Sequence, residues 1–204
     1  LVRNAAKHVN LEDAFVLDIG CNDGSLLSIF KAEGAKTVGI DPTDACQDAK
    51  NAGHVAYQDY FDINMARQLV EQHGTPAVVT FTNVFAHIED LDGLLKALDY
   101  LLGDHTILII ENHYLGSVLA GNQFDTFYHE HPRTYSFTSF EFISKRIGCS
   151  IVETVFPKRY GGNIRVLMRR TTDVETSPDF NEHAIRNAEA AFRKGLQQMA
   201  ISIN

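Results

Sequence analysis

An apolar run that ends in a glycine-rich turn constrains this chain more than any other stretch. Residues 15–19 have the length and composition of a buried parallel strand. Residues 20–24 interrupt the run, and the apolar residues of the next segment, 25–30, recur at helical spacing. A strand, a glycine turn and a helix in this order place backbone N–H groups and the positive end of a helix at the carboxyl edge of a sheet. Ligands bind at that edge in α/β proteins.

The acidic residues around this turn favour a cationic ligand. Asn22 stands where the dinucleotide-binding pattern G-x-G-x-x-G requires its second glycine. The carboxylate of Asp18 would repel a pyrophosphate but suits S-adenosylmethionine, which carries an ammonium and a sulfonium group and no phosphate. A second apolar run, residues 37–40, ends in Asp41, at the offset where an acid binds ribose hydroxyls. The pattern therefore favours S-adenosylmethionine over a nicotinamide cofactor or a plain tight turn.

The spacing D-x-G-x-x-x-G followed by VGID resembles the cofactor site of class I methyltransferases. This resemblance implies that Asp18 and the glycine turn bind the methionine part of the cofactor and that Asp41 binds its ribose. It also implies an acid beside the adenine, here Asp59 with the ring of Tyr60 or Phe61, although a solvated turn over buried rings explains the same residues. The expected cofactor-binding residues are Asp18, Gly20, Cys21, Asn22, Gly24, Asp41, Pro42, Asp59, Tyr60, Asn83 and Phe85.

Composition limits the partners of this chain. Its 204 residues, with 45% apolar and 22% charged side chains, are typical of one α/β domain with a sizeable core. The net charge of −8 argues against a nucleic-acid partner. Cys21, Cys46 and Cys149 are widely separated and form no C-x-x-C pair, which is typical of a reduced cytoplasmic protein without a structural metal. We recognise no signal peptide and no apolar run of membrane-spanning length, so no membrane partner is expected.

Alternating strand and helix patterns predict a doubly wound α/β fold with a mainly parallel sheet. Two later strands are expected to form an antiparallel hairpin. Such a hairpin closes the seven-stranded sheet of class I methyltransferases and does not fit a plain Rossmann dehydrogenase. The expected strands are residues 15–19, 37–40, 54–57, 76–82, 106–111, 149–156 and 163–170.

Helical spacing and capping residues predict the helices. Thr43 or Asp44 is the expected N-cap of the third helix, and Gly116 and Gly121 indicate an irregular segment. We expect a methyltransferase domain at residues 1–175, and at residues 176–204 a C-terminal helix that packs on it or leads to a further domain. The expected helices are residues 1–11, 25–32, 45–52, 64–73, 91–102, 139–147 and 181–201.

Residues 128–131, Tyr-His-Glu-His, permit three interpretations. His129 and His131 could bind a metal, although Glu130 would lie on the opposite face of an extended chain and no further ligand is near in the sequence. The block could also be a polar loop whose histidines bond backbone groups. Alternatively, it supplies general acid–base catalysis, because a carboxylate can orient an adjacent histidine and raise its basicity. His87, at the end of the fourth expected strand, should face the same edge of the sheet.

The segments DIGCNDGSLL, NVFAHI, FDTFYHEHPRTYSF and YGGNIRV are together similar to the sugar C-methyltransferases that methylate carbon 3 of a nucleotide-linked keto-deoxysugar. The similarity covers residues 15–166. It implies S-adenosylmethionine as the methyl donor and a thymidine-diphosphate 4-keto sugar as the small-molecule acceptor. It further implies that His131 removes a proton with the help of Glu130. By the same resemblance, Tyr128 and His87 hold the sugar and the developing enolate oxygen.

Several features differ from that family. Its zinc-binding domain before this region and its further α/β domain after it fall outside the 204 residues, Asn163 stands in place of a serine, and Tyr160 stands where histidine is common. These differences leave the sugar undetermined. Arg159 and Arg165 could meet a pyrophosphate or could be ordinary surface charges. A methyltransferase acting on oxygen or nitrogen and a silent cofactor-binding domain are alternative hypotheses, and the sequence does not determine the oligomeric state.

Overall fold

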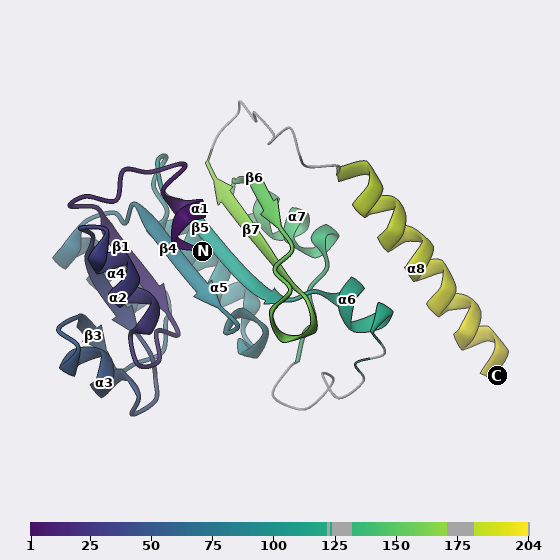
Figure 1. Cartoon of the computed structure of the whole chain (residues 1–204), viewed down its shortest axis with the longest axis horizontal. Coiled ribbons are helices and arrows are strands. Elements are labelled where there is room, and N and C mark those ends of the chain that lie inside the picture. Colours follow the sequence, from purple (N-terminus) through teal and green to yellow (C-terminus); the bar gives the residue numbers. More distant parts are fainter. Residues whose placement is uncertain (122, 124–131, 171–181, 204) are drawn as a thin grey trace.

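A seven-stranded sheet forms the centre of the part of the chain that the computed structural model describes, residues 1–121, 123, 132–170 and 182–203 (Figure 1). The strands are β1 (Phe15–Ile19), β2 (Lys36–Ile40), β3 (Val55–Tyr57), β4 (Val78–Thr82), β5 (Ile107–His113), β6 (Ser150–Val155) and β7 (Asn163–Arg169). They lie in the order β3-β2-β1-β4-β5-β7-β6. Neighbours are parallel from β3 to β5, and β7 is antiparallel to both β5 and β6. The predicted mainly parallel sheet with a closing hairpin is thus confirmed.

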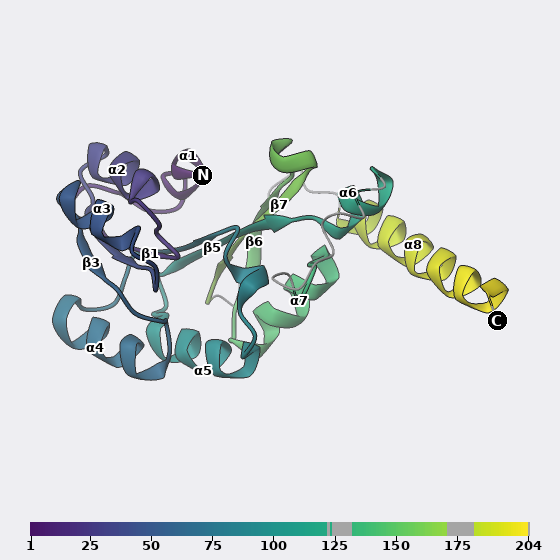
Figure 2. The ribbon, with the colours of Figure 1, turned by 90° about the horizontal axis from the view of Figure 1, so that it is seen from below.

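Helices cover both faces of this sheet, which Figure 2 shows from the side. The helices of the described residues are α1 (Val2–Ala5), α2 (Ser25–Ala32), α3 (Cys46–Asn51), α4 (Ile63–His73), α5 (Leu91–Leu101), α6 (Leu115–Ala120), α7 (Phe137–Arg146) and α8 (Glu182–Ile203), with short 3-10 turns η1 (Phe85–His87) and η3 (Arg159–Gly161). Helix α8 extends away from the sheet (Figures 1 and 2). Val16 and Ile109 face a core cluster under α1 and α2. Leu17 and Ile110 face the larger cluster under α4, α5 and α7. Burial on both faces explains why these strands are continuous apolar runs.

Side-chain caps determine where several helices begin. The carboxylate of Asp62 accepts hydrogen bonds from the backbone N–H groups of Asn64 and Met65 at 2.9 and 2.8 Å, which starts α4. Ser136 starts α7 through a reciprocal pair of hydrogen bonds with Ser139. Such caps satisfy N–H groups that have no partner inside the helix. The capping box explains why α7 begins two residues before the start predicted from the sequence.

Three local predictions differ from the structure. The expected helix at residues 1–11 is limited to α1, and residues 115–120, expected to be irregular, form α6. Neither Thr43 nor Asp44 caps α3, whose N-cap is Ala45 without a side-chain bond. The reason is competition, because Thr43 donates twice to the Asp41 carboxylate and the Asp44 carboxylate accepts from the amide of Gln58.

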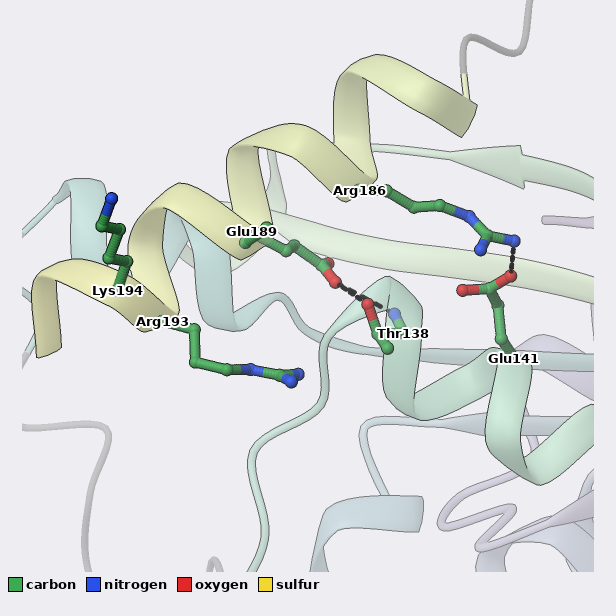
Figure 3. Close-up of a pocket in the computed structure, with 7 residues that line it drawn as sticks. Thr138, Glu141, Arg186, Glu189, Arg193 and Lys194 are labelled. Carbon is green, nitrogen blue, oxygen red and sulfur yellow. Dashed lines mark hydrogen bonds and ion pairs between the residues drawn. The ribbon is translucent and has the colours of Figure 1, made fainter. Parts of the chain in front are cut away.

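Helix α8 contacts α7 at two places, an ion pair of Arg186 with Glu141 and a carboxylate of α8 at the start of α7 (Figure 3). Glu189 accepts hydrogen bonds from the backbone N–H groups of Phe137 and Thr138, at 2.7 and 3.0 Å, and from the Thr138 hydroxyl. The Tyr114 hydroxyl donates to the same carboxylate at 3.1 Å. The positive end of α7 therefore receives a negative charge from a segment about fifty positions away in the sequence.

Replacing Glu189 by alanine should weaken the contact between α7 and α8. We expect the melting temperature to fall by about 2–4 °C, since a lost helix cap costs about 1 kcal/mol in a domain of this size. Trypsin should also cleave faster after Arg193 and Lys194 of α8, because the helix opens more often. The exposed glutamate of α4, Glu71→Ala, is the matched control. Equal melting temperatures and cleavage rates for the two variants would contradict the contact.

Candidate functional site

The loops after β1 and β4 touch at the carboxyl edge of the sheet. Gly20 has φ +77°, and a Cβ atom placed on it would lie 2.2 Å from the Cγ2 atom of Val84, so no larger residue fits. The backbone N–H groups of Gly20 and Cys21 both donate to the carbonyl of Ile40, at 2.8 and 3.0 Å, which ties this loop to the end of β2. Three strand ends thus converge on the glycine turn.

Asp41 joins the glycine turn to the turn after β2. Its Oδ2 atom accepts the N–H of Asn22 at 2.9 Å, and its Oδ1 atom accepts the N–H and the hydroxyl of Thr43 at 2.9 and 2.5 Å. Asn22 has a positive φ of 49°, which asparagine tolerates better than most residues. A carboxylate has about four acceptor positions. Three are used among the described residues, which leaves capacity for one donor from a ligand.

Asp18 is a carboxylate buried at the end of β1, where 3% of its surface is exposed. Its Oδ1 atom accepts the hydroxyl of Thr80, which lies beside it on β4, at 2.6 Å. Burial raises the pKa of Asp18 from 3.8 to about 7, the Thr80 bond opposes this shift, and the negative charge of Asp41 adds to it. A ligand cation near this site would favour the charged carboxylate. These residues therefore fit a donor that carries ammonium and sulfonium groups.

Other predicted cofactor residues are either exposed at the ends of β2 and β3 or belong to the glycine turn after β1. Pro42 and Asp59 are exposed near the ends of β2 and β3, and Tyr60 is 75% exposed. The carboxylate of Asp59 accepts the backbone N–H of Tyr60 at 2.7 Å, so part of its capacity serves its own turn. Gly24, with φ +78°, precedes the first residue of α2. Cys21 is buried, and burial raises its thiol pKa to about 12, so it contributes its backbone to the turn.

The structure places Phe85 differently from the prediction. Its ring is fully buried and packs against Phe81 and Tyr135, with ring centroids 5.3 Å away in both cases. Phe140 extends the same aromatic cluster. Because none of its surface is exposed, Phe85 supports the loop after β4 from the core and does not form an open wall of a pocket.

The sequence patterns did not predict a buried polar cluster that lies next to the loop after β4. Glu111, fully buried on β5, accepts the Nε atom of Arg165 at 2.7 Å and lies 2.6 Å from its Nη2 atom. The amide of Asn163 donates to Glu111 at 3.0 Å and to the Oδ1 atom of Asn83 at 3.2 Å. The alternation of polar side chains at positions 163 and 165 within an apolar strand was the available signal.

This cluster also corrects the interpretation of Arg165. Arg165 is buried, and its Nη1 atom donates to Asn4 at 2.7 Å while the rest of the guanidinium contacts Glu111. It is neither an ordinary surface charge nor open to a pyrophosphate. Arg159 is exposed, and its guanidinium lies over the ring of Tyr160, 5.3 Å from the ring centroid.

The acceptor side of the site is described in part. His87 ends η1 and is exposed, whereas Tyr128, Glu130 and His131 lie outside the described residues. Arg133 follows this block, and its guanidinium donates to the carbonyls of Ile88 and Glu89 at 2.7 and 3.0 Å. The chain two residues after position 131 is therefore attached beside η1.

The part of the chain that the structure describes shows neither a metal cluster nor a membrane-spanning helix. Within it, no group of three or more His, Cys, Asp and Glu side chains is arranged to hold a metal ion. The metal interpretation of His129 and His131 concerns positions outside it. Among the described helices, none combines the length and apolar composition of a membrane span.

Comparison with known proteins identifies the family. A family described as a methyltransferase domain matches residues 1–154. The chain belongs to this methyltransferase family. The methyltransferase is 28% identical over 192 residues to C-methyltransferase NovU of Streptomyces niveus, and the match covers 93% of this chain and 44% of that relative. It thus spans less than half the length of the relative.

Solved structures show the same fold. A SAM-dependent methyltransferase from Archaeoglobus fulgidus has a TM-score of 0.66 and 15% identity, with 82% of this chain and 90% of that chain covered. A magnesium protoporphyrin IX methyltransferase from Synechocystis PCC 6803 with bound SAH has a TM-score of 0.62 and 20% identity, covering 83% and 81% of the two chains. The predicted class I methyltransferase domain, with S-adenosylmethionine as its methyl donor, is confirmed at the level of the family.

Replacing Asp18 by asparagine should change how the stability of the ligand-free methyltransferase depends on pH. The folded chain holds a proton on Asp18 between pH 3.8 and about 7, which the unfolded chain releases. The contribution of Asp18 to stability therefore falls as the pH rises through this window. The free energy of unfolding of Asp18→Asn, relative to the unsubstituted chain, should increase from pH 4 to pH 8.

Urea unfolding at several pH values measures this difference. The exposed Asp104→Asn is the control for the change of side chain. A flat difference for Asp18→Asn would show that the Asp18 carboxylate is not a buried charge.

Proposed function

We propose that this methyltransferase transfers a methyl group to a carbon atom next to a ketone, and that the acceptor is carbon 3 of a nucleotide-linked 4-keto-deoxysugar. The observation that supports a carbon acceptor is the similarity to C-methyltransferase NovU over 192 residues. The YHEH block supports it as well, because carbon acceptors require a base while oxygen acceptors often require little beyond proximity. Since the chain spans 44% of that relative, the activity of the whole protein is part of the proposal.

In the proposal, the site binds S-adenosylmethionine through carboxylates that match its positive charge and through the shape of the glycine turn. S-adenosylmethionine supplies a methyl group activated by a sulfonium. In our proposal the Asp18 carboxylate compensates the positive charge of the donor, and the turn from Gly20 to Gly24 holds its methionine part. Asp41 accepts a ribose hydroxyl with its remaining acceptor position, and Asp59 with Tyr60 bounds the adenine. The burial of Asp18 and the three hydrogen bonds to Asp41 support these roles, because both carboxylates are fixed before a ligand arrives.

In the proposed reaction, His131 takes the proton from the acceptor carbon, with Glu130 orienting its ring. The electron pair of the broken C–H bond forms an enolate, and hydrogen bonds from Tyr128 and His87 stabilise its oxygen. The acceptor carbon then forms a bond to the methyl carbon as the bond from that methyl to sulfur breaks, and the proton stays on His131. The attachment of Arg133 to Ile88 supports this arrangement, because it brings the chain after His131 beside the turn that carries His87.

Deuterium at the acceptor carbon tests the reaction type. The chain is incubated with S-adenosylmethionine and thymidine-diphosphate 4-keto-deoxysugar deuterated at carbon 3, and exchange without enzyme is subtracted. We expect one deuterium released to solvent for each methyl group transferred. Methyl transfer without release would indicate an oxygen or nitrogen acceptor and would reject the proposal. Cofactor binding without turnover of the keto sugar would indicate a silent cofactor-binding domain.

The variant His131→Ala tests the base. We expect the transfer rate to fall by about 10²–10⁴, the range contributed by a general base, while calorimetry shows nearly unchanged affinity for S-adenosylmethionine. The exposed His105→Ala, on the turn before β5, is the matched control and should keep full activity. Full activity of His131→Ala would exclude His131 as the base.

A further inference from the structure

We propose that Asn163 is a positioning residue that holds the loop after β4 in the conformation the cofactor site requires. Asn163 lies on β7, in the hairpin that follows the acceptor segment, and is distant in sequence from the glycine turn. Its amide nevertheless reaches the first residue of the β4 loop. The inference rests on methyl transfer from S-adenosylmethionine and does not depend on the acceptor.

The loop after β4 begins with a residue in an unfavourable conformation. Asn83 has φ +55°, which costs energy for any residue with a Cβ atom, although asparagine tolerates it better than most. Two hydrogen bonds hold it, one from its own N–H to the carbonyl of Glu111 at 2.8 Å and one from the Asn163 amide to its Oδ1 atom at 3.2 Å. The second bond is a side-chain tether, which alanine at position 163 would remove.

The conformation of Asn83 decides where the next residues lie. Val84 follows, and its Cγ2 atom occupies the place where a Cβ atom of Gly20 would be. Phe85 is anchored in the aromatic core, and His87 ends the same short turn. A rotation at Asn83 would therefore move Val84 against or away from the glycine turn, because the buried ring of Phe85 holds the next residue in place. The tether on Asn83 thus controls the shape of the cofactor turn.

Charge fixes the direction of the Asn163 amide. The carboxylate of Glu111 accepts from this amide, so the NH₂ group faces Glu111 and the carbonyl oxygen, which the carboxylate would repel, faces away. Arg165 holds the carboxylate through its Nε and Nη2 atoms, and Arg165 is held in turn by Asn4. All of Glu111 and Asn163 is buried. The second N–H of the amide is therefore aimed at Asn83 by a rigid, charge-balanced cluster.

The test is a double-mutant cycle between positions 163 and 83. The dissociation constant for S-adenosylmethionine is measured by calorimetry for Asn163→Ala, for Asn83→Gly and for the double variant. We expect Asn163→Ala to raise the constant about tenfold, which corresponds to about 1.4 kcal/mol. Glycine adopts a positive φ without a tether. In the Asn83→Gly background the same change at position 163 should therefore alter the constant by about twofold or less.

One further variant separates positioning from a general loss of stability, and a second replaces Asn163→Ala if that variant does not fold. Ser144→Ala removes a buried hydrogen bond of α7 and should lower the melting temperature without changing cofactor affinity. If Asn163→Ala does not fold, Asn163→Ser takes its place, because a serine hydroxyl can bond Glu111 but cannot also reach Asn83.

An unchanged dissociation constant for the position-163 variant would overturn the inference. An equal effect in both backgrounds would overturn it too, because Asn163 would then act without Asn83. The readout is cofactor affinity, so it stays informative if the acceptor proves not to be a keto sugar.

Discussion

The loop after β4 can approach the turn after β1 because Gly20 has no Cβ atom. Val84 fills the space that a Cβ atom at position 20 would need. The turn can take this shape because Gly20 and Gly24 adopt positive φ angles at no steric cost and asparagine at position 22 tolerates one. The parallel strands β1, β2 and β4 end at one edge, so a single missing side chain lets three loops meet there. The proposed cofactor contacts of Asp18, Asp41 and the turn from Gly20 to Gly24 depend on this meeting.

The buried acids Glu111 and Asp18 differ in how their negative charge is balanced. Glu111 is compensated by the guanidinium of Arg165 and by the amide of Asn163, which makes it a structural anchor. Asp18 is bonded by the neutral hydroxyl of Thr80 among the described residues, and its pKa is raised to about 7. A buried carboxylate without a cation is costly. A positively charged ligand removes that cost, which is a physical reason for the domain to select a sulfonium donor.

Segments distant in the sequence complete both sides of the site. The β7 amide supports the β4 loop from behind, and Arg133 attaches the chain after the YHEH block to the residues that follow His87. At α7, Ser136 and Glu189 share the capping of one helix end, so α8 contributes the negative charge that the first turn of α7 lacks. In each case a backbone group or a strained residue obtains its partner from another part of the chain. Such contacts appear once the sheet is assembled.

The sheet, its hairpin and the glycine turn could be predicted from the sequence, because continuous apolar runs, helical spacing of apolar residues and the positions of glycine are local signals. The sequence also placed Asp18 and Asp41 at strand ends. The tertiary structure was needed to show that Phe85 supports the core and that Arg165 pairs with Glu111. A side chain with several possible partners takes the one that folding brings within hydrogen-bonding distance, and the register of β5 against β7 is what brought Arg165 opposite Glu111.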